Sequence, residues 1–191
     1  MGKTAEKIWN LPNILTMLRM ALIPVYVVVY KKGFYYAALL VFLIASLTDL
    51  LDGRIARKYQ LVTNFGKVMD PLADKLMCVT VLFSLSSSGT IHWIPVTIVI
   101  VKELIMLASG TYLLRNGIII QSQMIGKAAQ WLFILALAFS FFHDFFESWV
   151  LPVDVLLLWA AVATTLLALI FYAVNVTKQA NLIEPRKKSA L

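Results

Sequence analysis

The chain has 191 residues, of which 61% are hydrophobic and only 14% are charged. A soluble domain is nearer half apolar and a quarter charged, so this composition excludes an ordinary soluble protein and predicts an integral membrane protein with a single domain, residues 1–191. The formal net charge is +7, but the basic residues are scattered between apolar segments. We therefore expect anionic membrane lipid and phosphate-bearing substrates as partners, and no nucleic acid.

Six apolar segments follow one another along the chain, each close to the roughly 17–25 residues that a spanning helix needs. Before them, residues 3–11 (KTAEKIWNL) favour a short helix at the membrane interface. The expected fold is all-α, with six transmembrane helices and a short N-terminal interfacial helix. The six expected spans are Ile14–Tyr30, Phe34–Leu51, Val68–Leu85, Ile91–Leu114, Ile125–Phe146 and Val150–Val176.

The charges between the spans predict the orientation. One side of the membrane collects most of the Lys and Arg residues, whereas the other carries Lys31, Lys32, an uncharged SSSGT turn and the acidic HDFFES segment. By the positive-inside rule, both termini are cytoplasmic. Phe34 and Asp49 are separated by about 15 residues, roughly 22 Å of helix, which is less than the hydrocarbon core of about 30 Å. Asp49 is therefore expected near the inner edge of the bilayer.

Two polar groups lie at cytoplasmic helix ends. Pro12 and Asn13, followed by Thr16 and Arg19, are explained by a helix cap and an arginine that extends toward the membrane surface. Thr63 precedes the third span, where capping of the helix and contact with a ligand are equal alternatives.

The outer and central parts of the chain carry other ionisable residues. Lys102 and Glu103 are adjacent within the fourth span, where we expect a structural ion pair. His92 and His143 lie on the outer side, and the sequence assigns them no role in a site.

Four carboxylates interrupt the apolar pattern in two pairs within residues 49–74. Asp49 and Asp52 are three residues apart. Asp70 and Asp74 are four apart, and either spacing places both side chains on one helix face. Ionisable groups at membrane depth cost roughly 2.5–3.5 kcal/mol each and are usually functional. Two divalent cations would balance the four carboxylates, and hard oxygen ligands favour Mg²⁺ or Mn²⁺. A salt-bridge cluster with neighbouring Lys and Arg residues is the structural alternative.

Small residues accompany both pairs. Gly53 and Ala56 continue the helix face of the first pair, and Gly66 precedes the second pair by about one turn. Two such faces turned toward each other would leave room for a ligand against bare backbone.

This arrangement resembles the signature of the CDP-alcohol phosphatidyltransferase family. The extension through Pro71 to Lys75, together with LPNILT at residues 11–16, is similar to the branch that makes phosphatidylglycerophosphate from glycerol 3-phosphate. Cardiolipin synthases that use CDP-diacylglycerol look much the same in this region. The matching positions are Asp49, Asp52, Gly53, Ala56, Arg57, Gly66, Asp70 and Asp74.

The resemblance implies transfer of a phosphatidyl group from CDP-diacylglycerol to glycerol 3-phosphate, with release of CMP, by a multi-pass protein of a bacterial-type cell membrane. It implies two Mg²⁺ ions, with Mn²⁺ as a substitute, in an active site on the cytoplasmic side. It also makes Asp74 the general base. The residues that it assigns are Asp49, Asp52, Asp70 and Asp74 to the metals and Pro12, Asn13, Gly53, Arg57 and Thr63 to the CDP-lipid.

The second half of the chain departs from the phosphatidylglycerophosphate synthase pattern. That branch often shows Arg-Glu, Gly-Leu-Arg and Gly-Lys-x-Lys-Thr, so two basic residues expected in the acceptor pocket are missing here. The corresponding segments are Lys102-Glu103, Gly110-Thr111-Tyr112 and Gly126-Lys127-Ala128-Ala129.

Cations attract an acceptor phosphate, which makes Lys75, Arg115 and Lys127 the candidates for binding it. For Arg115 and Lys127, ordinary positive-inside residues are the alternative. Three other functions are weighed: a cardiolipin synthase with a more apolar acceptor pocket, an intramembrane prenyltransferase, which typically has more spans, and a divalent-cation transporter, whose carboxylates would lie near the bilayer midplane. A homodimer is compatible with the sequence.

Overall fold

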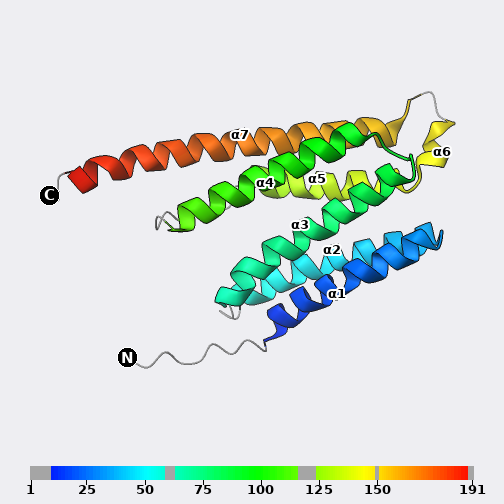
Figure 1. Ribbon diagram of the computed structural model, residues 1–191, viewed down its shortest axis with the longest axis horizontal. Helices are drawn as coiled ribbons and strands as arrows, with labels where there is room; N and C mark the ends of the chain where they lie inside the picture. Colours follow the sequence, from blue (N-terminus) through cyan, green and yellow to red (C-terminus); the bar gives the residue numbers. More distant parts are fainter. Residues whose placement is uncertain (1–9, 59–62, 116–123, 149–150, 189–191) are drawn as a thin grey trace. The chain divides into compact units, whose positions relative to one another are not determined.

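The computed structural model describes residues 10–58, 63–115, 124–148 and 151–188 (Figure 1). Every regular element in these ranges is a helix, as the apolar segments predict. The helices fall into two compact units, Met1–Ile91 and His92–Leu191. The expectation of one domain over residues 1–191 stays a prediction.

Three long helices make up the first unit: α1 (Leu11–Lys31), α2 (Tyr35–Lys58) and α3 (Asn64–Ser87). α1 packs against both α2 and α3, and α2 also contacts α3 (Figure 1). The turn from α1 to α2 is tight because Gly33 adopts a φ of 81°, in the left-handed region that glycine tolerates best. The buried apolar side chains between the helices include Tyr26, Phe42, Ala45, Ala73, Val81 and Leu82.

Side-chain caps define where α1 and α3 begin. The Asn10 side chain accepts a hydrogen bond from the backbone N–H of Asn13 at 3.0 Å, and Pro12 fits the first turn, where its missing N–H is not needed. Thr63 Oγ1 accepts from the backbone N–H of Gly66 at 3.0 Å. Of the two alternatives for Thr63, the structure shows capping, and contact with a ligand stays a prediction.

The second unit contains α4 (Trp93–Arg115), α5 (Met124–Ser140), α6 (His143–Glu147) and α7 (Val153–Lys188). α7 packs against each of the other three helices of this unit. The core of the second unit forms mainly between α5 and α7. Its buried apolar side chains include Phe133, Ala136, Leu137, Leu158, Ala161 and Val162.

The expected span Ile125–Phe146 is wrong at its second end. α5 ends at Ser140, and the short α6 begins at His143. In a continuous helix, Phe139 and Phe146 would be about two turns, roughly 10 Å, apart. Instead their rings stack with centroids 5.7 Å apart, so the break allows an aromatic contact that a straight helix would not make.

Among the described residues, three helical segments are long and apolar enough to cross a membrane: Leu11–Lys31, Trp93–Gly110 and Val153–Val176. Two shorter apolar segments are Tyr35–Asp49 and Ile125–Ser140. These helices support a membrane location, while a count of six spans stays a prediction. The expected interfacial helix lies almost entirely outside the described residues, which begin at its last two positions.

Candidate active site

One face of α1 carries three polar side chains that are almost completely buried. Asn13, Thr16 and Arg19 recur every three residues, which places them along one side of the helix. They are 2%, 1% and 1% exposed, respectively. Burying polar groups at this depth is costly unless each finds a partner. All three find one on α2 or at the start of α3.

Arg19 reaches across to α2. Its Nη1 lies 2.9 Å from Oδ1 of Asp49, whose side chain is 24% exposed. The expectation that Arg19 extends toward the membrane surface is therefore wrong. The guanidinium stays inside the unit because a carboxylate of the neighbouring helix meets it there.

Thr16 reaches across to α3. Its Oγ1 makes a short hydrogen bond with Oδ1 of Asp70 and also lies 3.1 Å from the carbonyl oxygen of Pro12. A hydroxyl has one proton, and an ionised carboxylate is a stronger acceptor than a backbone carbonyl. The Thr16 hydroxyl therefore donates to Asp70.

Asn13 completes the contact between the first turns of α1 and α3. Thr63 Oγ1 donates to Oδ1 of Asn13 at 3.0 Å while it caps α3. A Cβ added to Gly66 would lie 2.9 Å from Asn13 Oδ1 and 3.4 Å from Asp70 Oδ2. Gly66 is therefore needed for close packing beside the carboxylate, whereas the room for a ligand that the sequence led us to expect beside it stays a prediction.

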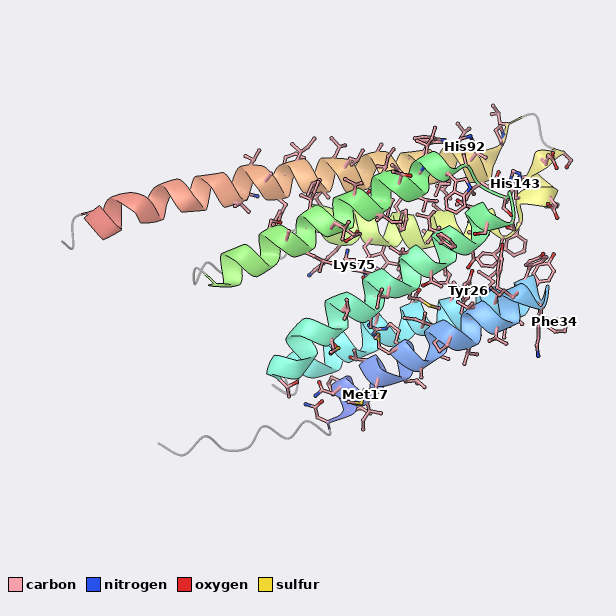
Figure 2. The ribbon with its side chains drawn as sticks, in the orientation of Figure 1. Met17, Tyr26, Phe34, Lys75, His92 and His143 are labelled. Atoms are coloured by element: carbon pink, nitrogen blue, oxygen red, sulfur yellow. The ribbon has the colours of Figure 1, made fainter. Side chains whose placement is uncertain are left out.

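The first carboxylates of the two pairs, Asp49 and Asp70, lie in the same electrostatic environment. Asp49 on α2 interacts electrostatically with Asp70 on α3 and with Lys75. Asp74 lies one turn beyond Asp70 on the same helix, and both Asp74 and Lys75 are half-buried. Figure 2 shows Lys75 on α3. The structure thus brings Asp49, Asp70 and Lys75 together from two helices.

The other predicted site residues are placed less completely. Asp52, Gly53 and Arg57 lie in the last turns of α2, and their side chains are outside the described residues. Arg115 ends α4, and its side chain is also outside them. Lys127 is an exposed residue near the start of α5. Because Arg115 and Lys127 belong to the second unit, their part in the site stays a prediction.

The donor set suits divalent cations. The side chains that the structure describes, which exclude Asp52, include no group of three or more His, Cys, Asp or Glu residues that would hold a metal ion. They do provide hard oxygen donors on two helices, as Mg²⁺ requires. These features fit a metal site whose occupation stays a prediction.

Thr16 and Arg19 are candidates that the sequence analysis missed as parts of the site. A signal for them exists in the sequence, because residues 13, 16 and 19 place three polar side chains on one face of an apolar helix. The argument that intramembrane polar groups are usually functional applies to this face as much as to the carboxylates.

The carboxylates that α1 contacts on α2 and α3 are signature positions of the CDP-alcohol phosphatidyltransferase family. The sequence model for CDP-alcohol phosphatidyltransferases matches residues 9–167, a region that includes residues 49–74 and all of α1. The chain belongs to the CDP-alcohol phosphatidyltransferase family. It is therefore a phosphotransferase of phospholipid biosynthesis, associated with membranes.

Several relatives are named CDP-diacylglycerol–glycerol-3-phosphate 3-phosphatidyltransferase. The one from Bacillus subtilis (strain 168) is 34% identical over 176 residues, which cover 84% of this chain and 91% of the relative. The one from Rickettsia bellii (strain RML369-C) is 36% identical over 132 residues, 68% of this chain and 73% of the relative. A protein of that name from Blochmanniella floridana is 27% identical over 180 residues, 89% of this chain and 92% of the relative. The similarity thus extends well beyond the motif.

Proposed function

We propose that the chain transfers the phosphatidyl group of CDP-diacylglycerol to glycerol 3-phosphate, giving phosphatidylglycerophosphate and CMP. The observation that carries the proposal is that relatives named for this activity match most of the chain. Their names favour glycerol 3-phosphate over phosphatidylglycerol, the acceptor of a cardiolipin synthase. The electrostatic grouping of Asp49 and Asp70 supports the same reaction. The donor carries a diphosphate, and metal ions held by carboxylates would bind it.

The proposed enzyme crosses a cell membrane six times, with both termini and the active site on the cytoplasmic side. The apolar helices and the excess of Lys and Arg residues on one side support this arrangement. A site at the inner rim of the bilayer reaches the headgroup of a lipid-linked nucleotide and a water-soluble acceptor at the same time.

The residues of the first unit would bind the donor at its diphosphate. Two bound Mg²⁺ ions would neutralise the diphosphate and stabilise negative charge on the departing CMP. Arg57 would add positive charge there, and Gly53 would leave space for the phosphates. The proposed ligands are Asp49, Asp52 and Asp70 for one ion, Asp49, Asp70 and Asp74 for the other, and Pro12, Asn13 and Thr63 for other parts of the CDP-lipid.

Proton transfer falls to Asp74, which would accept the proton of the acceptor hydroxyl. The hydroxyl oxygen bonds to the phosphorus that carries diacylglycerol, while the bond from this phosphorus to the CMP oxygen breaks and its electron pair leaves with CMP. A positioned base contributes typically about 10²–10⁴-fold to such a step. Lys75, next to Asp74, would attract the acceptor phosphate, with Arg115 and Lys127 as further proposed contacts.

The test uses the purified full-length chain in lipid nanodiscs with CDP-diacylglycerol and Mg²⁺. One alcohol is added at a time: glycerol 3-phosphate, phosphatidylglycerol, serine or inositol phosphate. We expect CMP and phosphatidylglycerophosphate with glycerol 3-phosphate. CMP release with phosphatidylglycerol alone would instead make the chain a cardiolipin synthase. Metal flux into sealed vesicles, without CMP release from any alcohol, would favour a cation transporter.

Individual acceptor contacts are tested by the apparent KM for glycerol 3-phosphate. Lys75→Ala, Arg115→Ala and Lys127→Ala should each raise this KM more than they lower kcat, because each removes a charge that attracts the acceptor. An unchanged KM removes that residue from the acceptor site without affecting the donor assignments.

A further inference from the structure

Helix α1 contains no acidic residue, yet it contacts a carboxylate of each neighbouring helix. Thr16 hydrogen-bonds to Asp70 on α3, and Arg19 pairs with Asp49 on α2. In both cases the contacted atom is Oδ1. The second oxygen of Asp70, Oδ2, lies 3.4 Å from the place that a Cβ on Gly66 would occupy. One oxygen of each carboxylate is thus held by α1, which would leave the other oxygen for a cation.

We propose that Thr16 and Arg19 are positioning residues, which orient Asp70 and Asp49 for divalent cations. α1 would then set the geometry of metal ligands that lie on α2 and α3. This inference rests on the proposed function only in taking the carboxylates as metal ligands. It does not depend on which alcohol accepts the phosphatidyl group.

The physical reason is that a carboxylate with free rotamers must be ordered each time an ion binds. A hydrogen bond from Thr16 orders Asp70 beforehand, and outer hydrogen bonds of this kind typically contribute 10–100-fold to metal affinity. Thr16 is 1% exposed, so water has little access to replace a deleted hydroxyl. The affinity should therefore respond to the hydroxyl itself.

Thr16 gives a cleaner test than Arg19. The Arg19 guanidinium orients Asp49, but its charge also repels a cation at the same carboxylate, so the two effects on metal affinity oppose each other. Thr16 is neutral, and Val has nearly its shape without the hydroxyl. The sign of a Thr16→Val effect therefore follows from the orientation of Asp70 alone.

The experiment measures Mn²⁺ binding to the full-length protein in nanodiscs without CDP-lipid, by electron paramagnetic resonance of the free ion. Mg²⁺ affinity follows from competition. We expect Thr16→Val to raise the Kd for Mn²⁺ about 10-fold or more. Thr16→Ser, which keeps the hydroxyl, should bind Mn²⁺ nearly as the unmodified protein does.

Thr80→Val is the matched control, because the Thr80 hydroxyl donates to the backbone carbonyl of Leu76 within α3. Its Kd should not change. Equal Kd values for Thr16→Val and the unmodified protein would overturn the proposal, as would an equal loss in Thr16→Ser or no Mn²⁺ binding at all. If Thr16→Val does not fold, the comparison of Thr16→Ala with Thr16→Ser decides in the same way.

The outcomes also separate this proposal from the proposed function. Weakened Mn²⁺ binding by Thr16→Val, in a protein that releases no CMP with any alcohol, would contradict the function and support the positioning role. Transfer to glycerol 3-phosphate, with the same Mn²⁺ affinity in Thr16→Val and the unmodified protein, would do the opposite.

Discussion

Both units of the molecule bury ion pairs, but one pair joins two helices and the other joins two neighbours on one helix. In the first unit, Arg19 on α1 meets Asp49 on α2. In the second, Lys102 Nζ lies 2.6 Å from Oε1 of Glu103, its neighbour on α4, with both side chains nearly buried. The Lys102–Glu103 pair confirms the ion pair expected within the fourth span. A pair within one helix neutralises itself, whereas a pair between helices also fixes how those helices meet.

A pair in the second unit that does join two helices shows what else is needed for a metal site. His143 Nδ1 lies 2.6 Å from Oδ2 of the fully buried Asp154, linking α6 to α7. This pair contains a single carboxylate. Asp49, in contrast, has Asp70 in its electrostatic environment. Two carboxylates brought together from different helices favour a cation site, whereas a single carboxylate with one partner predicts only stability.

The largest expected difference between the units is in catalysis. Asp70→Asn should lower CMP release at saturating Mg²⁺ on the order of 10³-fold, because the carboxylate charge that serves the diphosphate is lost. Asp154→Asn removes a buried carboxylate from the second unit and should leave turnover within about twofold while the protein is folded. Near-normal turnover of Asp70→Asn would place the carboxylates outside the chemistry.

The next expected difference is in the response of stability to Mg²⁺. Breaking a buried ion pair costs 3–5 kcal/mol, and the partial exposure of Asp49 places Arg19→Met near the lower value, at about 3 kcal/mol. Mg²⁺ should restore much of this loss, because an ion at the carboxylates supplies the missing positive charge. Lys102→Met should lose stability without a response to Mg²⁺. Thermal unfolding in nanodiscs, with and without saturating Mg²⁺, measures both, and an equal response would erase the proposed distinction.

The parts of the structure that could be predicted are those set by local periodicity. Apolar segments of spanning length predicted the long helices, and the spacing within residues 49–74 predicted two carboxylate faces. The grouping of Asp49 with Asp70 followed from a further physical requirement. Carboxylates in an apolar chain must share counter-charge, so they were expected to come together from separate helices.

The choice of long-range partners could not be predicted in the same way. Thr16 and Asp70 are 54 residues apart, and nothing in the spacing within α1 indicates which polar group meets Thr16. Arg19 illustrates the difficulty, because an arginine that extends to the membrane surface and one that pairs inside have the same local sequence. The end of α5 at Ser140 likewise could not be predicted from local periodicity, because the contact between Phe139 and Phe146 exists only after the chain has turned.

A smaller effect is expected where α1 and α3 approach each other most closely. Gly66→Ala places a methyl group 2.9 Å from Asn13 Oδ1, which should cost about 1–3 kcal/mol as the helices shift. CMP release should fall about 10-fold because Asp70 moves with α3. In α4, the space around Gly110 is open, so Gly110→Ala should stabilise the folded protein by about 0.5–1 kcal/mol. Unfolding and CMP release are measured for both variants, and equal effects would contradict the close-packing argument.

The smallest effect tests the pair that His143 and Asp154 form in the second unit. His143→Gln keeps an N–H donor for Asp154 but changes its reach, so the loss of stability should be about 1 kcal/mol, measured by thermal unfolding. CMP release and Mn²⁺ affinity should not change, because this pair contains only one carboxylate. A change in Mn²⁺ affinity while His143→Gln is folded would mean that the grouping of two carboxylates does not separate the cation site from structural pairs, and the comparison between the two units would lose its basis.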